Sequence, residues 1–180
     1  MPKEKEWTEF FDPNTILSLL GLNSSVVDAA DFGCGYGTFT MPAAKIIRGK
    51  IYAFDIEPEM IKEIEQKAKE LNLNNVEAIL RDFVAEGSGL KDLGVDYVML
   101  FNILHAEKPE TLLKEAYRIL RHGGRLGIIH WNYAATTPRG PPMVIRPKPE
   151  QCRKWAEMVG FSFEKQLDLK PYHYALVMRK

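Results

Sequence analysis

The stretch Asp31-Phe-Gly-Cys-Gly-Tyr-Gly37 is the part of this sequence that points most directly to a fold. It follows an apolar run, residues 26–32, that predicts a strand, and it precedes residues 38–47, which have a helical period. Glycine has no Cβ, so the backbone at Gly33, Gly35 and Gly37 can turn tightly and approach a ligand closely. A strand, a glycine turn and a helix in this order predict a nucleoside-binding site.

The spacing of the glycines separates two kinds of nucleoside site. In a dinucleotide fingerprint the third glycine falls three residues after the second, but that position is Thr38 here, and the glycine comes at position 37. This disfavours a pyrophosphate-binding loop and an NAD-dependent oxidoreductase. Asp55 stands at the end of the next predicted strand, residues 50–54, where a carboxylate could accept hydrogen bonds from ribose hydroxyls. The alternative is that Asp55 only stabilises the entry to the following helix.

Apolar runs bounded by turn residues alternate with helical segments along the rest of the chain. This alternation predicts an α/β fold, with a Rossmann-like, seven-stranded, mostly parallel sheet and helices on both faces. Further strands are expected at 76–80, 96–101 and 125–131, and helices at 58–71, 109–121 and 149–159. Residues 162–169 and 173–179 alternate in polarity around a short turn, so they predict a C-terminal antiparallel hairpin.

Length and composition set broad limits on the protein class. The 180 residues suit one domain, expected to comprise an N-terminal lid or helix (1–24), a cofactor-binding core (25–131) and a final part (132–180) with a proline-rich loop, a helix and the hairpin. The 24 basic and 24 acidic side chains cancel, so no global field favours nucleic acid. No apolar run reaches membrane-spanning length and no secretory signal is seen, so a cytoplasmic location is expected.

The two cysteines, Cys34 and Cys152, have no metal-ligand spacing. We therefore expect neither a bound metal nor a disulfide in a reducing compartment.

The sequence resembles the class I S-adenosylmethionine-dependent methyltransferases, particularly the small-molecule type that includes ubiquinone and menaquinone biosynthesis enzymes. The family's Asp-x-Gly-x-Gly-x-Gly motif matches residues 31–37, its acidic second motif matches Asp55, and its Asp-Phe pair matches Asp82 and Phe83. The resemblance implies S-adenosyl-L-methionine as cofactor, with the glycine loop at the methionine part, the second-strand acid at the ribose and the Asp-Phe pair at the adenine. The implied cofactor-binding residues are Asp31, Gly33, Cys34, Gly35, Gly37, Asp55, Ile56, Asp82, Phe83 and Asn102.

The acceptor is expected at the same edge of the sheet, because ligands of open α/β sheets gather beyond the carboxyl ends of the strands. His105, shortly after the fourth strand, is the candidate general base, and the alternative is that it caps a helix or lines the cofactor wall. Four residues near the ends of the later strands are substrate candidates: His130, Trp131, Tyr172 and His173.

The proline-rich loop, residues 136–150, leaves this edge and could roof the acceptor pocket. Residues 139–154 hold five basic side chains against Glu150 alone, a local charge of +4 that suits either an anionic substrate or a solvated surface. Near the N-terminus, Trp7, Phe10 and Phe11 could form a lid or pack a helix onto the sheet.

The sequence therefore predicts an S-adenosylmethionine-dependent methyltransferase acting on a small-molecule acceptor. A protein that binds the cofactor without catalysis is the alternative. The Asn/Asp-Pro-Pro-aromatic signature of amino-directed nucleic-acid enzymes is replaced by Asn-Ile-Leu-His at 102–105, which disfavours base methylation. The acceptor atom and the oligomeric state are left open by the sequence.

Overall fold

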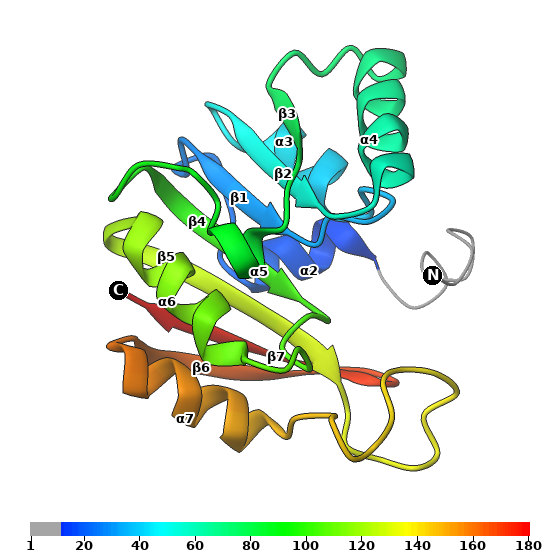
Figure 1. The fold of residues 1–180 in the computed structure, drawn as a ribbon, viewed down its shortest axis with the longest axis vertical. Coiled ribbons are helices and arrows are strands. Elements are labelled where there is room, and N and C mark those ends of the chain that lie inside the picture. The colour runs from blue at the N-terminus through cyan, green and yellow to red at the C-terminus, as the bar shows by residue number, and fades with distance from the viewer. Residues whose placement is uncertain (1–11) are drawn as a thin grey trace.

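A computed structural model describes residues 12–180, which form one sheet with helices on both faces (Figure 1). The strands are β1 (Ala29–Phe32), β2 (Ile51–Asp55), β3 (Val76–Leu80), β4 (Val95–Phe101), β5 (Leu120–Trp131), β6 (Ser162–Leu169) and β7 (His173–Arg179). The helices are α2 (Pro13–Leu19), α3 (Thr40–Ile46), α4 (Pro58–Glu70), α5 (Phe83–Glu86), α6 (Pro109–Ile119) and α7 (Pro149–Val159).

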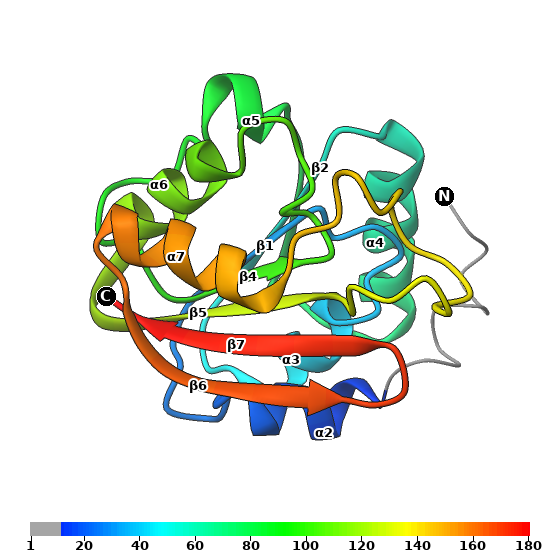
Figure 2. The ribbon, with the colours of Figure 1, turned by 90° about the horizontal axis from the view of Figure 1, so that it is seen from below.

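The seven strands lie in the order β3-β2-β1-β4-β5-β7-β6. The first five are parallel to one another, whereas β7 runs antiparallel to both β5 and β6. Figure 2 shows α5, α6 and α7 on one face of the sheet and α2 and α3 on the other. The predicted α/β fold, with its mostly parallel sheet and C-terminal hairpin, is confirmed.

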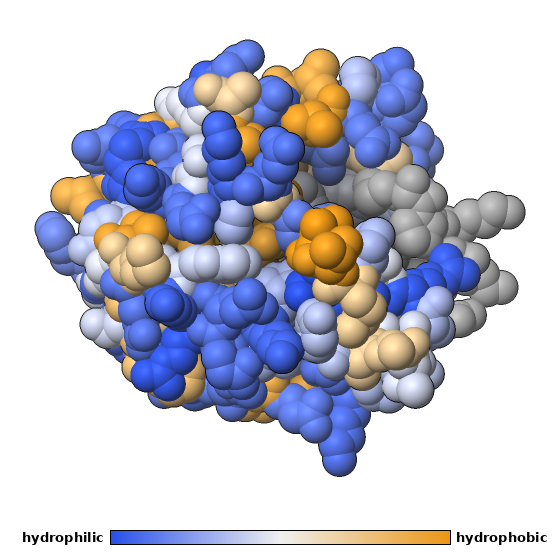
Figure 3. All heavy atoms as spheres, turned by 60° about the horizontal axis from the view of Figure 1, so that its bottom comes forward, coloured by the Kyte–Doolittle hydropathy of each residue, from blue (hydrophilic) through white to orange (hydrophobic). Residues whose placement is uncertain are grey.

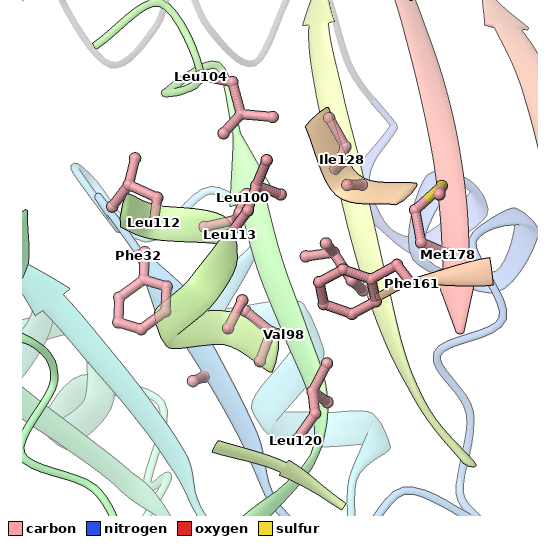
Figure 4. Packing of buried hydrophobic residues seen from close by; sticks show 14 of the residues in the cluster. Phe32, Val98, Leu100, Leu104, Leu112, Leu113, Leu120, Ile128, Phe161 and Met178 are labelled. Carbon is pink, nitrogen blue, oxygen red and sulfur yellow. The ribbon is translucent and has the colours of Figure 1, made fainter. Parts of the chain in front are cut away.

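Alternating side chains of the central strands enter two cores. Ala30 and Phe32 of β1 pack on the α6 and α7 face, together with side chains of β4 and α6, while Ala29 packs on the α2 and α3 face. Figure 4 shows Val98 and Leu100 of β4 between Leu112 and Leu113 of α6 and Ile128 of β5. The central strands are therefore buried on both faces, as their nearly continuous apolar sequences predicted.

The boundary between α6 and β5 differs from the predicted helix at 109–121, which Gly123 and Gly124 follow closely in the sequence. The helix ends at Ile119, because Leu120 is already extended and pairs with Val95 of β4. The two glycines lie inside β5, where the Gly123 amide donates to the Lys180 carbonyl and Gly124 accepts from the Lys180 amide. Contacts with distant strands thus decided a boundary that local turn residues had suggested elsewhere.

The first strand is also shorter than the predicted 26–32, since it begins at Ala29. The amides of Val27 and Asp28 donate to the carboxylate of Asp96 instead of a neighbouring strand. Arg121 bridges the Asp28 and Asp96 carboxylates at 3.2 and 2.8 Å. These charges lie at the amino ends of the strands, opposite the edge where a ligand is expected.

Within residues 12–180, no helix combines the length and the apolar character needed to cross a membrane.

Candidate functional site

The glycine loop between β1 and α3 has the conformation that its sequence predicts. Gly33, Gly35 and Gly37 have φ of 76°, 51° and 77°, in the left-handed region that residues other than glycine rarely adopt. The amides of Gly33 and Cys34 donate to the Phe54 carbonyl, both at 2.9 Å, which ties the loop to β2.

Close packing adds a second reason for two of these glycines. A Cβ on Gly33 would lie 2.8 Å from Cδ1 of Ile103, and one on Gly37 would lie 2.6 Å from Cδ1 of Ile64. A side chain at either position would force the isoleucine to shift and would strain a backbone of positive φ, whether or not a ligand is bound.

A cavity of about 350 Å³ opens beside the glycine loop. Its walls come from the glycine loop, the carboxyl ends of β4 and β5 and the proline-rich loop, and comprise Asp31, Gly33, Cys34, Gly35, Tyr36, Thr38, Phe39, Phe101, Asn102, His105, Trp131, Arg139, Gly140 and Pro141. The volume is within the range of small-molecule sites, and the cavity lies at the strand edge where open α/β sheets bind ligands.

Asp31 is a buried acid on the wall of this cavity, with only 4% of its surface exposed. The Thr40 hydroxyl donates to its carboxylate at 2.6 Å. Burial raises the pKa of Asp31 to about 7, opposed by the Thr40 bond and assisted by nearby Asp55. Asp31 is therefore poised to change charge near neutral pH when a ligand alters its surroundings.

Cys34, next along the wall, is a buried free thiol whose pKa is raised by burial. It stays protonated at neutral pH and is not an activated nucleophile. In residues 12–180, no group of three or more His, Cys, Asp and Glu side chains could hold a metal ion.

Asn102 offers the clearest sign of a ligand. Its backbone is left-handed, with φ of 54°, and its amide donates to the Ile129 carbonyl at 2.7 Å. Its side-chain oxygen Oδ1 is buried and has no hydrogen-bond partner among the described residues, although the residue lines the cavity. A buried acceptor without a partner is costly, so a ligand donor in the cavity would supply what the protein leaves out.

His105 also lines the cavity, and its Nδ1 lies 3.4 Å from Nε2 of His130. Burial lowers the pKa of His105, so the imidazole is neutral at pH 7 and can accept a proton. Burial, then the proximity of His105, lower the pKa of His130 to about 3, so His130 is also neutral. The pair can orient the His105 ring without adding a charge to the cavity.

Asp55 has the helix-entry role that the sequence offered as the alternative to ribose binding, and it also bonds to the glycine loop. One carboxylate oxygen accepts from the Gly35 amide at 2.9 Å, and the other accepts from the Glu57 amide at 3.1 Å, just before α4. The geometry at Glu57 is the helix-entry role, while the bond to Gly35 shapes the glycine loop. A carboxylate has about four acceptor sites, so ribose contacts are compatible with both bonds. Neighbouring Ile56 is 60% exposed, as a residue flanking an adenine would be.

Asp82 and Phe83, the pair expected at the adenine, have other partners within the protein. The Asp82 carboxylate accepts from the Val84 and Ala85 amides and caps α5, which the sequence did not predict. The Phe83 ring is buried and packs against Phe32 at 5.1 Å between centroids. The side chain of Phe83 therefore belongs to the core and is not available to an adenine ring.

Of the four substrate candidates, Trp131 lies on the cavity wall. His173 is buried against the Trp131 ring, with centroids 4.1 Å apart, and His130 is buried behind His105. Tyr172 lies in the turn before β7, is half-buried and is not among the residues that line the cavity. The cross-strand pairing of Trp131 with His173 set these positions, which sequence position alone could not separate.

The structure adds wall residues that the sequence did not single out. Tyr36 lies within the glycine motif, Thr38 and Phe39 follow it, and Phe101 precedes Asn102. Their position within or beside the motifs was the sequence signal that could have identified them as wall residues. The expected roof is present in part, since Arg139, Gly140 and Pro141 of the proline-rich loop line the cavity. The aromatic residues Trp7, Phe10 and Phe11 lie outside the described residues.

Comparison with known proteins agrees with this geometry. A family model described as a methyltransferase domain matches residues 24–175. A demethylmenaquinone methyltransferase from Geobacillus sp. (strain WCH70) is 33% identical over 101 residues, which are 54% of this chain and 42% of that protein. The match thus spans less than half of the relative's length.

Solved structures share the fold over nearly the whole chain. A SAM dependent methyltransferase from Aquifex aeolicus has a TM-score of 0.85 at 25% identity, covering 94% of this chain and 90% of its own. A geranyl diphosphate C-methyltransferase from Streptomyces coelicolor A3(2) has a TM-score of 0.78 at 13% identity. The match covers 93% of this chain and 76% of that one, and at this identity it supports the fold alone. Because the family model spans most of the sequence, including the glycine loop, the cavity edge and the closing strands, this chain belongs to the methyltransferase domain family.

Proposed function

We propose that this chain transfers the methyl group of S-adenosylmethionine to a small-molecule acceptor held in the cavity. The observation that carries the proposal is the cavity itself, which joins the glycine loop and the unpartnered oxygen of Asn102 to His105 and Trp131. The cofactor thereby fits the residues present: a backbone cradle without side chains, a buried acceptor that lacks a donor, and carboxylates at the ends of β1 and β2. When bound, S-adenosylmethionine supplies a methyl group on a positively charged sulfur.

Binding is assigned to four groups of this chain. The glycine loop lets the backbone meet the ligand, and Asn102 accepts a hydrogen bond from a ligand N–H or O–H. Asp55 holds the loop through Gly35 and accepts from ribose hydroxyls, while Asp31 favours positive charge on the ligand when ionised.

Catalysis in this proposal rests mainly on positioning. Methyl transfer needs the acceptor atom in line with the methyl group, and walls that hold both partners and exclude water supply much of the acceleration. His105 takes a proton from the acceptor if the acceptor must lose one, and its lowered pKa keeps it in the neutral form that this role requires.

The walls also favour a class of acceptor. Tyr36, Phe39, Phe101 and Trp131 give the cavity aromatic surfaces, which suit a flat or apolar molecule. The relative from Geobacillus is, by its name, a methyltransferase that acts on a demethylmenaquinone, which is an acceptor of this kind. Arg139 adds one positive group at the roof, so an acceptor with an acidic or phenolic group is the first kind to test.

The same proposal includes a cytoplasmic setting and no nucleic-acid substrate. Both cysteines are free thiols, as in proteins of reducing compartments, and the balanced charge of the chain offers no general attraction for phosphate backbones.

Ligand-dependent melting tests the cofactor assignment. S-adenosylhomocysteine at about 100 times its dissociation constant should add about 2.7 kcal/mol to stability, and S-adenosylmethionine should act similarly, while NAD and NADP should not. Equal stabilisation by NAD would contradict the proposal. Turnover is then measured by transfer of a labelled methyl group to metabolite pools that include phenols, quinols and prenyl phosphates. Cofactor binding without any transfer would favour the non-catalytic alternative.

A further inference from the structure

Arg146 is a buried cation in the middle of a surface loop. Only 6% of its surface is exposed, and its guanidinium donates hydrogen bonds to oxygens of the loop itself. The partners are the carbonyls of Pro141 (3.1 Å from Nε and 2.8 Å from Nη2), Arg139 (3.2 Å), Asn132 (3.1 Å) and Ala134 (3.3 Å), and the hydroxyl of Thr137.

The guanidinium charge of Arg146 has no acidic partner among residues 12–180. No carboxylate pairs with Arg146 in the described part of the chain, so its positive charge is balanced by carbonyl dipoles and the Thr137 hydroxyl. A buried charge is costly unless it is fully hydrogen-bonded, and guanidinium is the side chain whose flat fork can donate in several directions at once. The arrangement satisfies both the cation and the loop carbonyls that would otherwise lose water.

Apart from Arg146, the described backbone ties of the loop are few. The Asn132 amide donates to the Tyr172 carbonyl at 2.8 Å, and the amide and hydroxyl of Thr137 donate to the Ala134 carbonyl. Val144 and Ile145 point outward, 91% and 48% exposed, so they contribute little burial. On the face in Figure 3, hydrophobic residues form separate groups within a largely hydrophilic surface. The prolines at 138, 141 and 142 have no N–H to donate. Arg146, with six hydrogen bonds to residues 132–141, is therefore the main polar tie of this segment.

This loop is the roof of the cavity. Arg139, Gly140 and Pro141 face the same space as the glycine loop. At Gly140, which has φ of 113°, a Cβ would lie 2.8 Å from Nη2 of Arg146 and 2.8 Å from Cγ of Trp131. The roof is thus held between the guanidinium and the wall residue Trp131, with no room for a side chain.

We propose that Arg146 is a positioning residue that holds residues 132–141 as the roof of the cavity and so positions the molecule bound beneath it. The identity of that molecule rests on the proposed function, whereas the link between Arg146 and the roof does not. Arg146 touches no ligand in this proposal and acts through Arg139, Gly140 and Pro141.

Trypsin offers a direct measure of the roof. Trypsin cleaves after Arg or Lys but not before proline, and Arg146 and Lys148 both precede prolines, so residues 133–152 contain one cleavable bond, Arg139–Gly140. Cleavage there follows the population of the open loop when reclosing is fast. Arg146→Ala should raise its rate at least tenfold. Arg121→Ala is the matched control, because Arg121 also has several partners but lies at the amino ends of the strands.

Chemical rescue separates positioning from general destabilisation. Guanidinium chloride at millimolar, non-denaturing concentration should slow cleavage of the Arg146→Ala protein by refilling the vacated space. It should not rescue Gly140→Ala, which retains Arg146 but forces a Cβ against it. An unchanged cleavage rate in Arg146→Ala, the same rise in Arg121→Ala, or rescue of Gly140→Ala would each overturn the proposal.

Ligand affinity completes the test. The dissociation constant for S-adenosylhomocysteine, measured by calorimetry, should rise at least tenfold in Arg146→Ala and fall again with guanidinium, with no comparable change in Arg121→Ala. Rapid cleavage with unchanged affinity would show that Arg146 shapes the loop without positioning a ligand, and would overturn that half of the proposal. Failure of the wild-type protein to bind S-adenosylhomocysteine would refute the proposed function, while the cleavage results would still decide the role of Arg146 in the roof.

Discussion

Replacing Asp31 with asparagine should remove a pH-dependent loss of stability from the ligand-free protein. Asp31 is buried on the cavity wall, and burial raises its pKa from 3.8 to about 7. Asparagine has nearly the same shape, stays neutral at every pH used, and keeps an oxygen that can accept from the Thr40 hydroxyl. The substitution therefore changes the ionisation and little else.

The sign follows from proton linkage. Because the pKa of Asp31 is higher in the folded protein than in the unfolded chain, the folded protein retains a proton between about pH 4 and 7 that the unfolded chain has released. Stability from this group is present at low pH and is lost as the pH rises through about 7. From pH 5 to 8 the loss extends over about two pH units, or roughly 3 kcal/mol.

Urea unfolding of both proteins at pH 5 and pH 8 measures this loss. All other titrating groups are shared, so the difference in unfolding free energy between wild type and Asp31→Asn isolates Asp31. That difference should move by roughly 3 kcal/mol in favour of the variant from pH 5 to pH 8. The same difference at both pH values would refute the inference that Asp31 is a buried acid with a raised pKa.

Three further substitutions test the site. Asp55→Ala should weaken S-adenosylhomocysteine binding by about 1.5 to 3 kcal/mol in calorimetry. If the substitution weakens binding of the 2′-deoxy analogue less, part of the lost binding energy belongs to the ribose contact. Equal losses for both ligands would mean that Asp55 acts only through its bonds to Gly35 and Glu57. His105→Ala should lower turnover by roughly 100-fold with little change in S-adenosylhomocysteine affinity, and an intact rate and pH profile would exclude a general base. Gly37→Ala should cost at least about 1 to 2 kcal/mol of unfolding free energy even without ligand, because of its positive φ and the contact with Ile64, and an unchanged urea midpoint would contradict this.

The fold was largely predictable because its signals are local. Apolar runs of strand length, proline at the first turns of α4, α6 and α7, and the left-handed Gly160 that ends α7 each depend on a few neighbouring residues. The hairpin strands Ser162–Leu169 and His173–Arg179 match their predicted bounds for the same reason. The predictions erred where a distant partner intervened, as at Leu120, which pairs with Val95, and before Ala29, where Asp96 takes the backbone amides.

The site was predictable only up to a point. Residues joined to a motif, such as Asp31, Asn102 and His105, do meet at one cavity. Whether a side chain faces that cavity or the core was not readable from position, since Phe83 turned inward against Phe32.

The sequence by itself determined the left-handed glycine loop, the alternation of strands and helices, and the edge at which a ligand would bind, because glycine freedom, apolar period and strand direction are properties of short segments. Only the tertiary structure decided that Asn102 keeps a buried oxygen without a partner, that Asp55 fastens the loop through Gly35, and that Arg146 folds the proline-rich loop into a roof. Each of these depends on which atoms from distant segments come within hydrogen-bonding distance. Burial then raises the free-energy effect of each such bond, and of each bond that is missing.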